Sequence, residues 1–160
     1  MIKEIIIYTD GGCQNNGKKD CYGASAYLVL INGEHLQENV NSLFNTSNNK
    51  AEMQAIINSL TYLSDNNLTK HNINLYSDSE YCVKGISEWS KKWKSFGWKR
   101  TKNAKERVLN CNLWMELDEL VSNFPNLKFN WVKGHEDNEW NNYVNDLCTA
   151  KQEIMKNNLV

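Results

Sequence analysis

Apolar residues repeat with a two-residue period, or in short unbroken runs, in five stretches of this chain, and this pattern predicts β-strands. Aliphatic and β-branched residues fill the first stretch, as in a buried strand. The second and third stretches flank Asn32-Gly33, a dipeptide typical of a tight hairpin turn. The predicted strands cover residues 2–9, 22–31, 34–43, 73–76 and 127–133.

Other stretches place apolar residues three or four positions apart, which predicts helices. Ser47 precedes the first of these helices and can cap it. The last carries an apolar stripe formed by Trp140, Val144, Leu147, Cys148 and Ile154. The predicted helices cover residues 47–64, 79–86, 88–95, 109–123 and 139–156. This order of elements predicts the α/β class, with a five-stranded mixed sheet flanked by helices.

The chain has 160 residues, 41% of them apolar, and a single proline, which is typical of one folded domain. We expect that domain to cover residues 1–156, with a tail at 157–160. No apolar run approaches the roughly 20 residues of a membrane span. The five cysteines are scattered without a close pair, which argues against a disulfide framework and favours the reducing cytoplasm. We also expect a monomer.

Charge is distributed unevenly, although the net charge of the whole chain is only −1. Residues 91–107, which we call the basic segment, contain eight lysines and arginines and one glutamate. The basic segment therefore carries +7 and the remainder of the chain −8. A basic segment on an acidic body suits the binding of a polyanion.

Three acidic residues stand where the apolar pattern predicts buried positions. Asp10 ends the first apolar run, and Asp78 ends the fourth. Glu52 lies on the apolar side of the first long helix, in line with Ile56 and Leu63. Active sites of mixed α/β sheets gather near strand ends, so we expect the three carboxylates to meet there. Converging carboxylates without basic partners repel one another, and a bound cation such as Mg²⁺ relieves that repulsion.

The motifs around these acids resemble those of the type 1 ribonuclease H family, in its cellular form with a basic protrusion. The similarity extends from about residue 3 to residue 151, with the motifs in the family's order and spacing. The matching segments are Tyr8-Thr9-Asp10-Gly11-Gly12-Cys13 with Asn16 and Gly23, Thr46-Ser47-Asn48-Asn49-Lys50-Ala51-Glu52-Met53, Tyr76-Ser77-Asp78-Ser79-Glu80-Tyr81-Cys82-Val83, and Trp131-Val132-Lys133-Gly134-His135. The segments that match the tryptophan-rich protrusion are Trp89, Trp93, Gly97-Trp98-Lys99, Asn110 and Leu113-Trp114.

The resemblance implies an endonuclease that hydrolyses the RNA strand of RNA–DNA hybrids and leaves 5′-phosphate and 3′-hydroxyl ends. It assigns Asp10, Glu52 and Asp78 to a site for two Mg²⁺ ions, for which Mn²⁺ can substitute. Two ions about 4 Å apart can activate the attacking water and stabilise the leaving oxygen. His135 matches the family's mobile histidine, which assists proton transfer or product release.

The family's fourth carboxylate is an Asp ten residues after that histidine, and this chain has Asn145 there. Asn141, Val144 and Leu147 keep the surrounding motif in this register. One inserted loop residue would instead place Asp146 at the position, and the helical pattern alone does not decide between the two. A neutral amide oxygen suits Mg²⁺ less well than a carboxylate. The Asn145 register therefore predicts impaired cleavage, in an engineered or a natural variant, with a catalytically inactive hybrid-binding module as the alternative function.

Substrate contacts are implied for short polar residues beside the acids and for the basic segment. RNA–DNA hybrids are recognised through backbone shape and 2′-hydroxyls, because RNA-type grooves hide base edges from side chains. The sequence allows Trp93 to be a core residue, whereas Trp98 between Gly97 and Lys99 is harder to explain as one. The implied substrate-binding residues are Asn16, Ser47, Asn48, Asn49, Trp93, Trp98, Lys99 and Arg100. A start at Met1, directly before the first strand, favours a stand-alone protein over the nuclease domain of a larger polymerase or integrase.

Overall fold

Five strands form one mixed sheet in the order β3-β2-β1-β4-β5 in the computed structural model, which describes residues 1–133 and 138–158. β2 pairs antiparallel with β1 and β3, and β4 pairs parallel with β1 and β5. The strands are β1 (Ile5–Gln14), β2 (Tyr22–Ile31), β3 (Glu34–Phe44), β4 (Ile73–Ser77) and β5 (Leu127–Trp131). The predicted five-stranded mixed sheet is confirmed.

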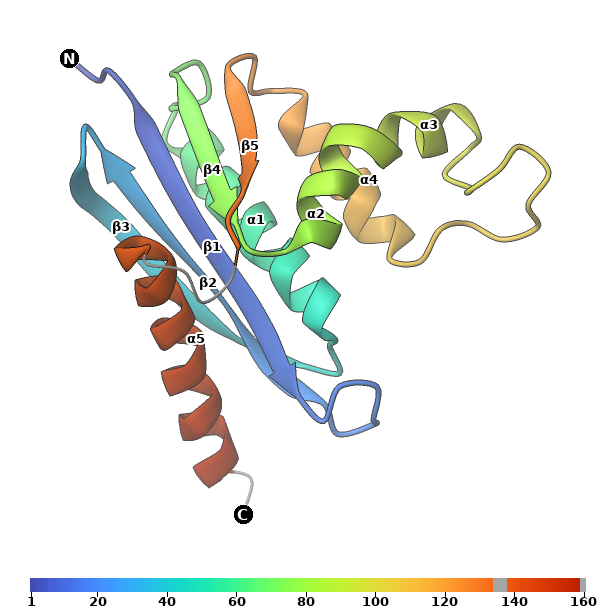
Figure 1. Cartoon of the computed structure of the whole chain (residues 1–160), viewed down its shortest axis with the longest axis horizontal. Coiled ribbons are helices and arrows are strands. Elements are labelled where there is room, and N and C mark those ends of the chain that lie inside the picture. The colour runs from blue at the N-terminus through green and yellow to red at the C-terminus, as the bar shows by residue number, and fades with distance from the viewer. Residues whose placement is uncertain (134–137, 159–160) are drawn as a thin grey trace.

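Helices cover both faces of this sheet (Figure 1). α1 (Asn48–Asp65) packs on β1 and β2 from one side, and α5 (Glu139–Asn158) packs on β1, β2 and β3 from the other. The remaining helices are α2 (Glu80–Lys84), the π-helix η1 (Gly85–Trp89), α3 (Ser90–Ser95) and α4 (Cys111–Val121). None of the described helices is both long and apolar enough to cross a bilayer.

Alternate residues of β1 enter two different cores, because successive side chains of a strand point to opposite faces. Ile5 and Ile7 belong to the larger core, together with Ile56 of α1. Tyr8 belongs to the smaller core, together with Val144 of α5. β1 is therefore held from both sides, which fixes the strand that carries Asp10.

β1 continues four residues beyond Asp10, which corrects the prediction that the first strand ends near this residue. The parallel pairing with β4 does end at Thr9 and Ser77. Among the described strands, β1 then pairs only with β2, as far as Gln14. Past Thr9 it thus has a free edge on the β4 side, and we call residues 10–14 the free edge of β1.

α5 buries a different stripe from the predicted one. The residues buried under it are Asn141, Val144, Cys148 and Met155. Trp140 and Leu147 are only half-buried, and the prediction is wrong at Ile154, which is 55% exposed. The buried face of α5 is thus rotated about the helix axis relative to the predicted one. This rotation affects which of Asn145 and Asp146 can face the acids.

The basic segment begins in α3 and continues as a loop that leads to α4 (Figure 1, yellow). Trp93 and Trp98 are half-buried and pack against the larger core. Trp93 therefore packs against the core, as the sequence allowed. Trp98 does so too, contrary to expectation. Lys99 is half-buried and Arg100 is exposed, so the tryptophans attach the loop to the body while the charges face solvent.

Gly11 allows α1 to approach β1 closely. A Cβ atom on Gly11 would lie 2.3 Å from the carbonyl carbon of Ala51 and 2.5 Å from the backbone nitrogen of Glu52. These backbone atoms belong to the first turns of α1 and cannot move singly. The absent side chain at Gly11 therefore sets the distance between the free edge of β1 and the turn that carries Glu52.

We predict that Gly11→Ala lowers the free energy of unfolding by roughly 2 kcal/mol or more, because the new methyl group displaces α1. Gly12→Ala is the matched control, since a Cβ there would meet only Gln152 Nε2 at 3.5 Å and Asn48 Oδ1 at 3.9 Å. Urea unfolding of both variants measures the difference. Equal loss of stability in the two variants would show that the close approach of α1 is not the constraint.

Candidate active site

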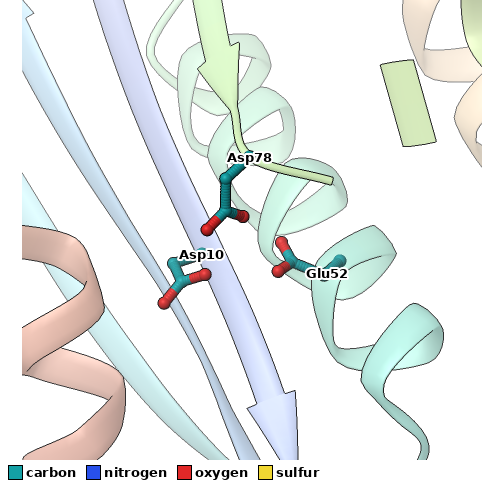
Figure 2. Close-up of side chains that lie close together, drawn as sticks. All are labelled: Asp10, Glu52 and Asp78. Atoms are coloured by element: carbon teal, nitrogen blue, oxygen red, sulfur yellow. The ribbon is translucent and has the colours of Figure 1, made fainter. Parts of the chain in front are cut away.

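Three acidic side chains converge at the free edge of β1 (Figure 2). Asp10 comes from β1, Glu52 from α1, and Asp78 from the link between β4 and α2. One carboxylate oxygen of each lies within 4.8 Å of the others. Asp10 is only 5% exposed and Glu52 9%. The structure thus brings together the three acids that the sequence pattern singled out.

Two neighbouring groups act on Asp10. The backbone N–H of Gly11 favours the ionised carboxylate and so lowers the pKa of Asp10. The thiol of Cys148, a buried residue of α5, donates to the Asp10 carbonyl oxygen at 3.3 Å. Cys148 therefore ties α5 to β1 at the acid itself.

Asp78 lies between two serines whose hydroxyl oxygens accept backbone hydrogen bonds. The backbone N–H of Ser79 donates to Ser77 Oγ at 3.1 Å, and Ser79 Oγ caps α2 by accepting from the N–H of Cys82 at 3.2 Å. The carbonyl oxygen of Asp78 accepts a hydrogen bond from Trp131 Nε1 at 3.2 Å. The chain direction at the end of β4 is thereby fixed from both neighbours and from β5.

Burial, followed by mutual repulsion, disfavours the ionised forms of Asp10 and Glu52. Burial, and then the charge of Asp78, raise the pKa of Asp10 to about 7, although hydrogen bonds from Glu52 and the Gly11 N–H lower it. Burial, followed by the charges of Asp10 and Asp78, holds the pKa of Glu52 well above its usual range. The ion pairs among the described residues involve none of the three acids. Among the described residues, no basic side chain therefore forms an ion pair that would balance the charge of the three acids.

The donor set fits a hard divalent cation. Glu52 Oε2 is buried and has no hydrogen-bond partner among the described residues. A buried oxygen that lacks a partner costs stability unless something occupies its lone pairs. Carboxylate oxygens are the ligands that Mg²⁺ and Mn²⁺ prefer. A cation would satisfy Glu52 Oε2 and remove the repulsion at the same time.

Short polar residues form a hydrogen-bonded group next to the acids. Asn16 Oδ1 accepts from the backbone N–H of Asn48 at 3.2 Å, and Asn48 Oδ1 accepts from the N–H of Cys13 at 2.9 Å. Ser47 is the N-cap of α1, and its Oγ accepts from the N–H of Lys50 at 3.1 Å. Asn16, Ser47 and Asn48 thus lie together at the start of α1, with the half-buried Asn49 following.

Asn145 and Asp146 are both exposed residues of α5, but they point in different directions. Successive residues of an α-helix are rotated by about 100°. Measured from Cys148, which touches Asp10, Asn145 lies about 60° away and Asp146 about 160° away. Asn145 therefore borders the buried stripe, whereas Asp146 points away from the sheet.

The flank of α5 that carries Asn145 is the one directed at β1. Gln152, on the same flank, accepts a hydrogen bond from Gln14 Nε2 at the free edge of β1, at 2.8 Å. On the opposite flank, the Tyr143 hydroxyl donates to Glu38 of β3 at 2.6 Å. Asn145 consequently lies on the side of the acid cluster. His135, the other residue expected here, lies outside the described residues.

Comparisons with known proteins agree with this architecture. The RNase H family model matches residues 2–154. A protein named ribonuclease H from Acetivibrio thermocellus is 43% identical over 98% of this chain and 98% of its own length. One from Clostridium botulinum is 40% identical over 92% of this chain and 94% of its own.

Solved structures show the same fold. A structure described as LC9-RNase H1, "a type 1 RNase H with the type 2 active-site motif", superposes with a TM-score of 0.80 at 25% identity, over 96% of this chain and 74% of that one. LC11-RNase H1 in complex with RNA/DNA hybrid superposes with a TM-score of 0.68 at 22% identity, over 91% of this chain and 94% of that one.

Sequence reasoning missed three residues that hold the acids: Gly11, Cys148 and Trp131. Gly11 acts through the close approach of α1, and Cys148 acts through the carbonyl oxygen of Asp10; both depend on tertiary contacts that a single sequence does not show. Alternation along a strand places Trp131 on the same side as Leu127 and Phe129, which are half-buried. It is instead 49% exposed and bonded to Asp78. A tryptophan at a strand end, two residues beyond the core residue Phe129, was the available signal.

We predict that the stability of the metal-free protein falls as pH rises from about 4 to about 7. The folded state holds a proton on Asp10, with a pKa of about 7, that the unfolded state releases near the ordinary pKa of an aspartic acid, 3.8. The unfolded state therefore binds fewer protons in this window, and about 4 kcal/mol is lost across it. The contribution is complete below pH 4 and absent above pH 7.

Asp10→Asn removes this loss and should stabilise the metal-free protein at pH 8. Thermal unfolding in a chelator, from pH 4 to pH 8, measures the effect, with the exposed Asp20→Asn as the control. An unchanged pH profile in Asp10→Asn would contradict the raised pKa.

Proposed function

The chain belongs to the ribonuclease H family, and from this premise we propose that it is an endonuclease that hydrolyses the RNA strand of RNA–DNA hybrids. The observation that carries the proposal is the convergence of three carboxylates, two of them buried and one half-buried, at the free edge of β1. We assign the activity to residues 1–156 and expect 5′-phosphate and 3′-hydroxyl products.

Asp10, Glu52 and Asp78 are the residues that would hold two divalent metal ions, with Mg²⁺ as the expected cofactor and Mn²⁺ as a substitute. Such ions, when bound, supply the positive charge that activates a water molecule and stabilises the leaving oxygen of a phosphodiester. The protein itself holds three anionic oxygens in fixed positions, at a site with little water. Gly11 sets the position of Glu52, and the Cys148 thiol holds the Asp10 carbonyl oxygen.

RNA–DNA hybrid is the proposed substrate. The group formed by Asn16, Ser47 and Asn48 lies beside the acids, where it can reach a backbone phosphate or a 2′-hydroxyl. Lys99 and Arg100 of the basic segment would neutralise phosphates further along the duplex. The structural neighbour LC11-RNase H1, which is described in complex with an RNA/DNA hybrid, supports this choice of substrate.

Asn145 is the residue we assign to the fourth ligand position, and we propose that it weakens cleavage. Its place on the flank of α5 directed at β1 supports this register over Asp146. An amide oxygen carries no charge, so it contributes less to binding a divalent ion than a carboxylate does. The neighbour LC9-RNase H1 is described as combining the type 1 fold with the type 2 motif, so a type 1 fold can carry another active-site motif.

Cleavage of a labelled hybrid in Mg²⁺ or Mn²⁺ tests the function. The proposal predicts slow RNA cleavage that stops when a chelator is added. Complete inactivity at high protein concentration, with hybrid still bound, would identify the chain as a hybrid-binding module. Cleavage of the DNA strand would overturn the proposed substrate specificity.

We predict that Asn145→Asp raises the cleavage rate roughly tenfold or more, because a fourth negative charge joins the site. Asp146→Asn should change the rate by less than about twofold, since Asp146 points away from the sheet. Steady-state cleavage rates of both variants beside the unaltered chain measure the two effects. The reverse pattern would mean that Asp146 supplies the ligand.

We predict that binding of an uncleavable hybrid depends strongly on salt. Removing Lys99 and Arg100 together, as Lys99→Ala with Arg100→Ala, should reduce the slope of log affinity against log salt by roughly 1.5, from two lost phosphate contacts. Lys3→Ala with Lys70→Ala is the matched control, because both lysines are exposed and precede β1 and β4 at the ends remote from Asp10 and Asp78. Equal slopes in the two double variants would argue against the role of the basic segment.

A further inference from the structure

Trp131 combines a large, half-exposed side chain with a direct contact to the acid cluster. It is the last residue of β5, and its backbone pairs with Ser77, the last residue of β4. Its side chain is 49% exposed, yet its indole Nε1 donates a hydrogen bond to the carbonyl oxygen of Asp78 at 3.2 Å. The indole therefore reaches one residue beyond the end of the sheet, to the acid itself.

Asp78 differs from the other two acids in how its backbone is held. Asp10 lies within a strand and Glu52 within a helix, so the hydrogen bonds of these elements fix both. Asp78 lies between β4 and α2, in neither element. The last backbone bond of the sheet here runs from the Val132 N–H to the Ser77 oxygen, at 2.9 Å. Asp78 is thus the acid whose orientation depends most on side-chain contacts.

The indole N–H is the contact that fixes the Asp78 carbonyl. The two serine hydrogen bonds nearby use atoms of Ser77 and Ser79 and leave that carbonyl free. Among the described residues, no other hydrogen bond ends on it. A rotation of the peptide between Asp78 and Ser79 would break the bond to Trp131 and turn the Asp78 backbone. The position of the carboxylate against Asp10 would change with it.

We propose that Trp131 is a positioning residue that orients Asp78 for metal binding through its indole N–H. The proposal rests on the proposed metal-dependent function and assigns to this chain a further element, β5, that contributes to the site. This positioning role does not involve the exposed face of the indole ring. Stacking of that face on a nucleotide is a different role, which would require the ring and not the N–H.

Trp131→Phe separates these roles, because it keeps an aromatic ring and removes the N–H. We expect the Mg²⁺ concentration for half-saturation to rise roughly threefold to tenfold, which corresponds to one lost hydrogen bond. The KM for hybrid should change by less than about twofold. Trp140→Phe is the matched control, since this half-buried ring packs by apolar and aromatic contacts. It should leave both quantities unchanged.

Calorimetric titration with Mg²⁺ gives the affinity without relying on cleavage, and circular dichroism verifies that each variant is folded. In the unaltered protein, the ¹⁵N–¹H signal of the Trp131 indole, identified by its absence from Trp131→Phe, should shift when Mg²⁺ is added. This signal reports on the positioning contact even if a variant is unstable.

Unchanged Mg²⁺ affinity in Trp131→Phe, with an indole signal insensitive to Mg²⁺, would overturn the inference. A rise in KM for Trp131→Leu at unchanged Mg²⁺ affinity would instead assign the ring to substrate stacking. If the unaltered protein bound no Mg²⁺ at all, the proposed metal centre would fail, and the positioning role with it. The absence of Mg²⁺ binding in the unaltered protein can be distinguished from a loss of Mg²⁺ affinity that is confined to Trp131→Phe.

Discussion

Mutual repulsion among three converging carboxylates, two of them buried, is the constraint on which the rest of this site depends. Burial and neighbouring charge raise the pKa values of Asp10 and Glu52, and Glu52 Oε2 has no partner among the described residues. Folding alone would favour moving these side chains apart or replacing them. The fold instead brings the three side chains together from β1, from α1 and from the end of β4. Such an arrangement is stable only when a cation binds or protons are retained.

The place where the carboxylates meet follows from unequal strand lengths. β4 stops at Ser77 while β1 continues, so the free edge of β1 leaves room for side chains from both faces of the sheet. α1 reaches this edge because Gly11 has no side chain. From the other face, α5 is fixed by the Cys148 thiol on the Asp10 carbonyl. The same contacts that build the fold therefore also set the geometry of the acids.

Much of this could be predicted from the sequence, for identifiable reasons. The second strand was predicted with its observed bounds and the first helix with its observed Ser47 cap, because alternation and capping are local signals. The meeting of the acids was inferred from their positions at strand ends and on a helix. The stripe of α5 was misassigned at Ile154, since a helix that is only half-covered allows several stripes of similar apolarity. The carbonyl contacts of Cys148 and Trp131 depend on tertiary register, which a single sequence does not show.

The central claim, that the acid cluster is a divalent metal site, is tested most directly by diffraction. Crystals grown with Mn²⁺ and measured at its absorption edge would reveal any bound ion by anomalous scattering. The account predicts an anomalous peak between the carboxylates of Asp10, Glu52 and Asp78, with oxygen ligands at roughly 2.0–2.3 Å. The absence of a peak at millimolar Mn²⁺ and neutral pH, with the three carboxyl groups hydrogen-bonded to one another, would contradict it.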